Sequence, residues 1–177
     1  MRSWLPVPGT TSGRLVEAAL ELFGAHGFAP VGVVSIAERA GVTTGSLYHH
    51  FGSKEGLYRL VRSDVEQRLV DRLEGAVAAR PVTSIADLAP VLLVGFDYLV
   101  ASGYARLLGE SPPDAAARED PVEQLLSRWI AQGETLSALV AAAWRAALWH
   151  ASIDPRGVAG ARSALERLVG GVEKPPR

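Results

Sequence analysis

Twenty residues starting at Val33, with the sequence VVSIAERAGVTTGSLYHHFG, constrain the fold of this chain more than any other segment. Ala37 supplies the small residue needed where two helices cross, and Gly41 supplies a residue that tolerates a positive φ in a tight turn. The apolar residues that would lock the second helix onto the first are Ile36, Ala40, Val42, Leu47 and Phe51. This spacing predicts a helix-turn-helix at residues 33–52.

The second helix of this unit has two distinct faces. At ~100° per residue, Leu47 and Phe51 turn inward together. The outward half then holds Gly45, Ser46, Tyr48 and His49. Thr43 stands at the N-cap, where the free N–H groups of the first turn are available to a phosphate. Gly45 allows that end of the helix to approach a nucleic-acid groove closely. The pattern predicts binding to double-stranded DNA.

The side chains of this face suit different parts of a DNA duplex. Ser46 and His49 have donors and acceptors for base edges, whereas Tyr48 and the nearby cation Lys54 would reach phosphates. The net charge of the whole chain is −1, and residues 1–54 carry four Lys or Arg side chains against three Glu. Since this balance provides little non-specific attraction to DNA, we expect binding to depend on hydroxyls, backbone N–H groups and helix N-termini.

The segment from Arg14 to Leu57, which includes RLVEAALELFGAHGF and AGVTTGSLYHHFGSKEGL, strongly resembles the DNA-binding region of the TetR family of transcriptional regulators. The resemblance implies a three-helix DNA-binding domain, a helical ligand-binding and dimerisation domain, and repression that a small molecule relieves. It also implies DNA contacts from Thr43, Thr44, Gly45, Ser46, Tyr48, His49 and Lys54. The chain departs from the family pattern in two places: Val31 and Gly32 stand where the family usually has a Thr or Ser cap, and Val34 replaces a polar residue.

The remainder of the chain predicts an all-α fold, because Ala, Leu, Val and Arg dominate it and strong β signals are scarce. Helices are expected at residues 12–26, 53–80, 84–101, 104–109, 121–132, 134–151 and 156–169, in addition to the two short ones within 33–52. The predicted organisation is a flexible arm at 1–11, a DNA-binding domain at 12–54, a helical bundle for effector binding and dimerisation at 55–170, and a tail at 171–177.

The helix expected at 84–101 is apolar nearly all round, which is typical of a buried central helix. We expect its neighbours to enclose a cavity for a small apolar or aromatic effector. The candidate lining consists of Leu92, Phe96, Tyr104, Leu107, Trp129 and Trp144, with Asp97 and Arg128 as polar anchors. These aromatic side chains would serve equally well in a solid core, and a chain without a cavity would instead be a DNA-binding or protein-interaction module that needs no effector.

Two apolar stripes predict a homodimer. The residues that form them are Leu136, Leu139, Ala143 and Ala147 in one helix, and Val158, Ala161, Leu165 and Leu168 in the last helix. Four helices that meet across a two-fold axis would bury both stripes. The apolar run at 135–153 also has the length of a membrane span, but Arg145 lies near its middle, where a charge costs about 2.5–3.5 kcal/mol. A buried interface helix and a cytoplasmic protein are therefore expected.

Other classes of function find little support. The chain has no cysteine, and it lacks the G-x-S-x-G and H-E-x-x-H motifs of hydrolytic enzymes. His49 and His50 point about 100° apart on a helix and have no evident third ligand, so no metal site is expected. Asp64, Glu66 and Asp71 are interpreted as a solvated helix face. A helical enzyme is the alternative class, and we expect neither catalysis nor a cofactor.

Overall fold

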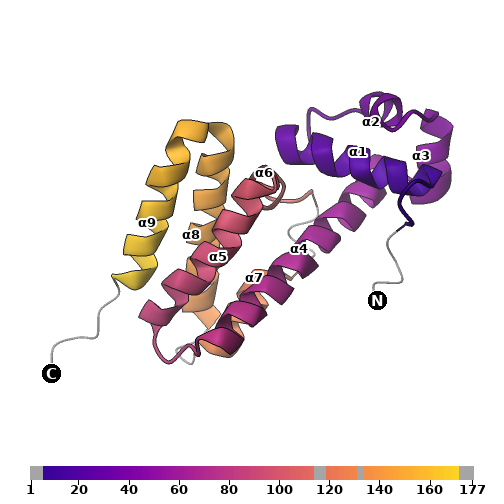
Figure 1. The fold of residues 1–177 in the computed structure, drawn as a ribbon. Coiled ribbons are helices and arrows are strands. Elements are labelled where there is room, and N and C mark those ends of the chain that lie inside the picture. Colours follow the sequence, from indigo (N-terminus) through magenta and orange to yellow (C-terminus); the bar gives the residue numbers. More distant parts are fainter. Residues whose placement is uncertain (1–5, 114–118, 131–133, 172–177) are drawn as a thin grey trace, which may run out of the picture.

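The computed structural model describes residues 6–113, 119–130 and 134–171, and every regular element in this part of the chain is a helix (Figure 1). The predicted all-α fold is confirmed. Several expectations lie outside the described residues: 1–5 of the predicted arm, 131–132 at the end of one predicted helix, and 172–177 of the predicted tail.

Three short helices form a unit at one end of the molecule (Figure 1): α1 (Thr11–His26), α2 (Val33–Ala40) and α3 (Thr44–Phe51). Thr10 begins α1 as its N-cap, because its hydroxyl accepts a hydrogen bond from the Gly13 N–H at 3.1 Å. The Thr10 N–H in turn donates to the Val7 carbonyl at 3.2 Å. The described end of the predicted arm is therefore a structured turn.

A long helix, α4 (Lys54–Ala79), leaves this unit and runs along the rest of the molecule (Figure 1). Ser53 is its N-cap and accepts a hydrogen bond from the Gly56 N–H at 3.0 Å, as the sequence predicts. The first part of α4 packs on α1 and α3, and its later part packs on α5 and α7. Since a single helix contacts both halves of the molecule, its position links them.

The remaining elements form a helical bundle around α4. They are a 3₁₀ turn (Ile85–Asp87), α5 (Leu88–Ala101), α6 (Ala105–Gly109), α7 (Pro121–Trp129), α8 (Glu134–Ile153), a second 3₁₀ turn (Pro155–Gly157) and α9 (Val158–Gly170). In this bundle α8 lies against α6, α7 and α9, and α5 lies between α4 and α9. The cap-and-proline signal at Asp154 and Pro155 marks the turn before α9, where the Asp154 carboxylate accepts from the Arg156 N–H at 2.9 Å.

The centre of the bundle is solid. Leu92, Phe96, Leu107 and Trp144 are completely or almost completely buried within one continuous apolar cluster. The Trp144 indole N–H donates to the Leu92 carbonyl at 3.0 Å, so its polar atom is satisfied inside the core. These four residues of the predicted effector lining therefore pack against protein.

Two acidic residues of α4 are buried, which makes the interpretation of them as a solvated face wrong. Asp64 is 0% exposed and Glu66 is 6% exposed, whereas Asp71 is exposed as expected. The reason is that helices cover α4 on more than one side, and each buried carboxylate has an arginine partner. Arg62 donates to Glu66 at 2.9 Å, and Arg68 forms an ion pair with Asp64.

Among the described helices, α8 alone is long and apolar enough to cross a membrane when only length and composition are considered, and 39% of its most apolar stretch is buried in the fold. The core helix of a globular protein meets the same two criteria. Here α8 packs against α6, α7 and α9, so the bundle itself accounts for an apolar composition on those faces.

Candidate nucleic-acid interface

A tight turn sets the angle between α2 and α3. Gly41 adopts the left-handed conformation, with φ 65° and ψ 39°. The Gly41 N–H donates to the Glu38 carbonyl at 3.1 Å and the Val42 N–H donates to the Ala37 carbonyl at 3.0 Å, which is the hydrogen-bond pattern of a Schellman motif. A side chain at Gly41 would make this conformation costly, so the glycine positions α3.

The outer face of α3 gathers the residues that the sequence singles out. Thr43 caps the helix, and its hydroxyl accepts from the Ser46 N–H at 3.3 Å. Tyr48 is 53% exposed, His49 and Gly45 are also exposed, and Thr44 and Ser46 are half-buried. Leu47 is fully buried beneath them. The helix therefore presents hydroxyl, phenol and imidazole groups on one side while its apolar side holds it in place.

His50 is a further exposed residue of α3 that the sequence analysis considered only as a metal ligand. Its ring centroid lies 5.1 Å from that of His49. Within the described residues, no group of three or more His, Asp or Glu side chains is arranged to hold a metal ion. The two imidazoles therefore extend the polar face of α3.

Lys54 lies in a different environment from the α3 residues. Its ammonium donates to the carbonyl oxygens of Phe28 and Val31, at 3.0 Å each, and lies 4.0 Å from the centroid of the Phe28 ring. Lys54 therefore fastens the loop between α1 and α2 to the start of α4. Sequence reasoning missed this role, because a lone lysine at a helix start shows no partner in the sequence.

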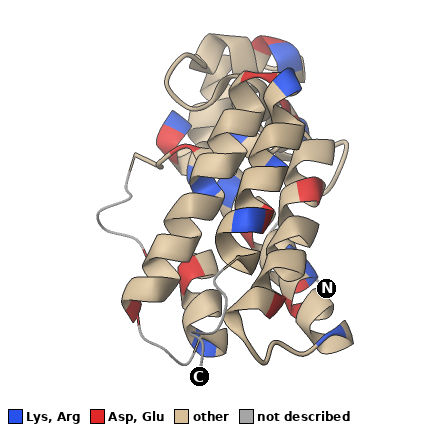
Figure 2. Ribbon diagram, turned by 90° about the vertical axis from the view of Figure 1, so that its left-hand side faces the viewer, with Lys and Arg blue, Asp and Glu red and all other residues tan. Residues whose placement is uncertain are grey.

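The described arginines of the DNA-reading unit (α1–α3) also have protein partners. Arg14 Nε donates to the Ala40 carbonyl at 3.1 Å, and Arg39 forms an exposed ion pair with Glu21. In the view of Figure 2, Lys and Arg positions are interspersed with Asp and Glu positions along the helices. In the described part of this unit, hydroxyls and helix N–H groups are therefore more available to a ligand than the arginine side chains, which already have protein partners.

A second candidate site is a polar pocket of about 840 Å³ between α4, α7, α8 and the segments flanking α7. Its lining residues are Arg62, Glu66, Ser111, Pro112, Glu119, Asp120, Pro121, Glu123, Gln124, Ser127, Arg128, Glu134 and Arg145. Of the predicted effector-lining residues, Arg128 alone is in this set. The pocket is therefore charged, whereas the sequence predicted an apolar one.

The other predicted lining residues lie elsewhere. Tyr104 and Trp129 are half-buried and pack on the edge of the core. Asp97 is exposed and forms an ion pair with Arg162 of α9, with Nε to Oδ1 at 2.9 Å. The carboxylate on α5 is thus paired with another helix at the surface. It does not line the polar pocket.

The α8–α9 groove, of about 690 Å³, runs between those two helices. It is lined by Ala143, Ala146, Ala147, His150, Ile153, Asp154, Gly157, Gly160, Ala161, Ala164, Leu165 and Leu168. Five of the eight predicted dimer residues line this groove. Of the other three, Leu139 is exposed on α8, and Leu136 and Val158 are half-buried against the core. Leu165 is only 3% exposed within the single chain, so most of its burial is intramolecular.

Comparison with known proteins supports the interpretation of the N-terminal helices as the DNA-binding part of a transcriptional regulator. Residues 15–61 match the family of bacterial regulatory proteins described as the tetR family. The chain is 41% identical over 83 residues to the HTH-type transcriptional regulatory protein RaaS of Mycobacterium tuberculosis, and 33% identical over 85 residues to the HTH-type transcriptional regulator BetI of Escherichia coli. The matched segments are 46% and 48% of this chain, and they span only 39% and 43% of those relatives.

Solved structures share the whole fold at low sequence identity. A structure described as a tetR family transcription regulator from a Shewanella species aligns with a TM-score of 0.68 and 23% identity, covering 92% of this chain and 97% of that one. The regulator FadR of Bacillus subtilis, solved with stearoyl-CoA, aligns with a TM-score of 0.66 and 19% identity, covering 90% of this chain and 98% of that one. At this identity the likeness shows the fold alone.

Proposed function

We propose that this chain is a transcriptional regulator, most simply a repressor, that binds a palindromic operator as a homodimer and is released by a small molecule. The match of residues 15–61 to the tetR family of bacterial regulatory proteins supports the proposal. The observation that carries the proposal is the outer face of α3. There Thr43 and Ser46 stand at the N-terminus of the helix, Tyr48 and His49 continue the exposed face toward its C-terminus, and Leu47 is buried beneath.

This face suits the major groove of DNA. The helix N-terminus and the Tyr48 hydroxyl provide donors for phosphates, and Ser46 and His49 provide groups for base edges. Thr44 and Gly45 would bring the backbone close to the sugar–phosphate chain. Lys54 would take part either by holding the loop at Phe28 in place or by exchanging its carbonyl partners for a phosphate.

An operator selected from a random DNA library with the full chain provides the test. His49→Ala should weaken binding by about 1–3 kcal/mol and relax the base preference, because a base-edge contact is lost. Tyr48→Phe should weaken binding about equally on all sequences. Arg156→Gln, on the turn before α9, is the control. If His49→Ala changes neither affinity nor base preference, the assignment of α3 as the reading helix is wrong.

The α8–α9 groove supports the dimer. A hollow lined by Ala and Gly lets helices of a second copy approach closely, and the exposed leucines Leu139 and Leu168 flank or line the same surface. Two copies related by a two-fold axis would place two α3 helices on half-sites about 34–36 Å apart, or slightly more. A light-scattering measurement that gives the monomer mass at micromolar concentration would contradict this arrangement.

The polar pocket supports release by a small molecule. Its volume suits a metabolite, and one of its walls is α4, which begins at the DNA-reading unit. The stearoyl-CoA of the FadR structure is not carried over as a ligand, because Pro112 and Pro121 are the only apolar residues among the described residues that line the pocket. A ligand that binds better to the state incompetent for DNA would weaken operator binding through α4.

A further inference from the structure

We propose that the polar pocket binds its effector through an anionic group, a carboxylate or a phosphate, held between Arg62 of α4 and Arg145 of α8. We further propose that Arg62 transmits this binding to the DNA-reading unit. The inference rests on the proposed function, since it names the ligand class and the route by which that ligand regulates. It also replaces the expected apolar effector with a polar one.

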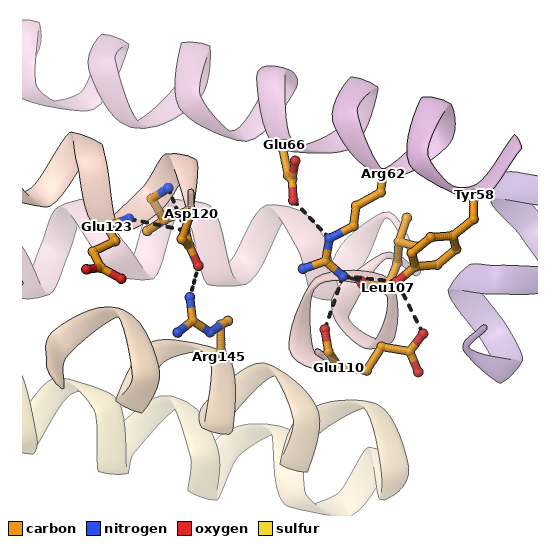
Figure 3. Close-up of polar contacts among 9 residues, drawn as sticks. Tyr58, Arg62, Glu66, Leu107, Glu110, Asp120, Glu123 and Arg145 are labelled. Carbon is orange, nitrogen blue, oxygen red and sulfur yellow. Dashed lines mark hydrogen bonds and ion pairs between the residues drawn. The ribbon is translucent and has the colours of Figure 1, made fainter. Parts of the chain in front are cut away.

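The two arginines approach the pocket from opposite sides. Figure 3 shows Arg62 extending from α4 and Arg145 extending from α8 into the space between these helices. Both line the pocket. Arg62 is 5% exposed and is fixed by four hydrogen bonds through Nε and Nη1. A buried and fixed guanidinium at the pocket floor is a preorganised binding group for an oxyanion.

At this end of the pocket the two guanidiniums repel each other. The pKa of Arg145 is lowered, first because burial penalises its charged form and then because Arg62 repels it. Each guanidinium has one carboxylate partner, Glu66 for Arg62 and Asp120 for Arg145. An oxyanion bound between the two guanidiniums would accept from both, offset their repulsion and compensate the desolvation of Arg145.

The other charges of the pocket determine how the ligand is oriented. Figure 3 places Glu123 on the far side of Asp120 from Arg62. Glu119, Glu123 and Glu134 also line the pocket, so its remaining charge is mostly negative. Like charges would repel a polyanion there. The ligand is therefore a molecule with one anionic end at the arginines and a neutral or cationic polar remainder.

Arg62 is also connected to the DNA-reading unit by a short series of hydrogen bonds. It donates to the Tyr58 hydroxyl at 3.1 Å, to the Glu110 carbonyl at 3.1 Å and to the Leu107 carbonyl (Figure 3). The Tyr58 hydroxyl donates to the Glu110 carboxylate at 3.4 Å. The same carboxylate oxygen accepts the backbone N–H of Phe28, between α1 and α2, at 2.7 Å.

An anion on Arg62 would therefore act at a distance. It would draw the guanidinium toward the pocket and so weaken its hydrogen bonds to the Tyr58 hydroxyl and to the carbonyls of Leu107 in α6 and Glu110 directly after α6. Glu110 would lose its fixed position and with it the hold on the Phe28 N–H. Lys54 fastens the carbonyl of the same Phe28 residue, so a shift there would move the loop before α2. The geometry makes Glu110 a positioning residue for the DNA-reading unit.

The binding test uses the full chain at constant ionic strength with four probes, measured by calorimetry. Benzoate and inorganic phosphate represent the two sources of an anionic group, while benzamide and benzylamine are the neutral and cationic counterparts of benzoate. We expect at least one anion to bind, and to bind Arg145→Gln about 10-fold more weakly through the loss of a charge-assisted hydrogen bond. Arg156→Gln, outside the pocket, should behave as wild type.

The coupling test follows hydrogen exchange of the Phe28 amide. The anion that binds should speed this exchange several-fold in wild type. Glu110→Ala should still bind the anion but lose the response, because Glu110 does not line the pocket. Glu110→Gln keeps an acceptor for the Phe28 N–H and should retain part of the response.

The inference is overturned if neither anion binds, if benzamide or benzylamine binds more tightly than both anions, if Arg145→Gln binds as wild type, or if the Phe28 amide does not respond. Operator binding by the wild type without any probe is measured separately. If the wild type binds no DNA, the proposed function fails, whereas DNA binding combined with any of the four outcomes above refutes only the anion site and its coupling.

Discussion

Two hollows in the described part of the bundle have similar volumes and opposite chemistry. The polar pocket, of about 840 Å³, is lined mostly by arginines and acids, whereas the α8–α9 groove, of about 690 Å³, is lined mostly by alanines, glycines and leucines. One helix contributes to both. Arg145 of α8 faces the polar pocket, while Ala143 and Ala147 of the same helix face the groove.

The difference shows why volume alone does not assign a role. A hollow with fixed charges discriminates between small solutes, because a wrong ligand leaves its buried polar groups unpaired. A hollow with small apolar side chains makes no such distinction, but it lets another helix approach closely. The first is therefore proposed as an effector site and the second as a contact between copies.

The largest expected effect is a loss of stability caused by a substitution in α8, the helix that lies between the two hollows. Trp144→Ala should lower the free energy of unfolding by about 3–5 kcal/mol, because a fully buried indole and its hydrogen bond to Leu92 are lost. Urea unfolding measures this change in the free energy of unfolding. Leu139→Ala, at an exposed position of the same helix, should change stability by less than about 0.5 kcal/mol in the monomeric state. A small effect at Trp144 would mean that the two hollows are not separated by a solid core.

The next largest effect is expected on operator affinity, when a charge is placed in the α8–α9 groove. Leu168 is 56% exposed in the single chain, so Leu168→Arg should leave the fold intact while it prevents a second copy from docking. The operator affinity should then fall about 100-fold, because the second half-site is no longer tethered. Leu165 is a poorer choice, since its side chain is already buried in the chain itself.

The matched variant is Gln124→Arg, which places the same charge on an exposed residue of the polar pocket. It should leave the dimer unchanged in light scattering. If Gln124→Arg disrupts the dimer and Leu168→Arg does not, the roles of the two hollows are reversed.

A smaller effect on stability is expected at Asp120, a single carboxylate that lines the polar pocket. Asp120 caps α7 by accepting from the Val122 and Glu123 N–H groups, and it also forms an ion pair with Arg145. Asp120→Ala should reduce stability by about 1–2 kcal/mol through the lost cap. Asp120→Asn keeps a capping side chain and should cost less. Equal losses in the two variants would show that the ion pair, and not the cap, is the important contact.

The smallest expected effect is on the pH dependence of stability, and it comes from Asp87, which lines neither hollow. Hydrogen bonds from Thr83 and Ser84 lower the pKa of Asp87 from 3.8 to about 2. A carboxylate with a lowered folded-state pKa stabilises the fold above the unfolded value and loses this contribution as the pH falls through the folded value. The melting temperature of Asp87→Asn should therefore lie below that of wild type at neutral pH, and the gap should close between about pH 4 and pH 2. A gap that is constant with pH would contradict this.

The local signals in the sequence were sufficient for the DNA-reading unit. The spacing of Ala37, Gly41 and Leu47 placed a turn between two helices, and the structure has that turn at Gly41. Ser53 marked the start of α4. These signals work because caps and turns depend on residues a few positions apart, so the sequence contains all of the partners.

Features that depend on distant partners were not predictable. An Arg62–Glu66 pair four residues apart is the same in sequence whether solvent or another helix covers it, and only the packed bundle shows that it is buried. Phe96 and Trp144 were equally consistent with core and with a cavity wall, because both environments are apolar. The role of Lys54 depends on carbonyls more than 20 residues away.

The engagement of Lys54 has a consequence for the thermodynamics of DNA association. A protein that neutralises phosphates with lysine and arginine releases condensed counterions, and its affinity then falls steeply as the salt concentration rises. In the described part of the DNA-reading unit and the start of α4, Arg14, Arg39 and Lys54 all have partners within the protein. If these contacts persist on the operator, few counterions are displaced. The association constant should then depend only shallowly on salt, and base contacts rather than bulk ionic attraction would determine how long the protein stays bound.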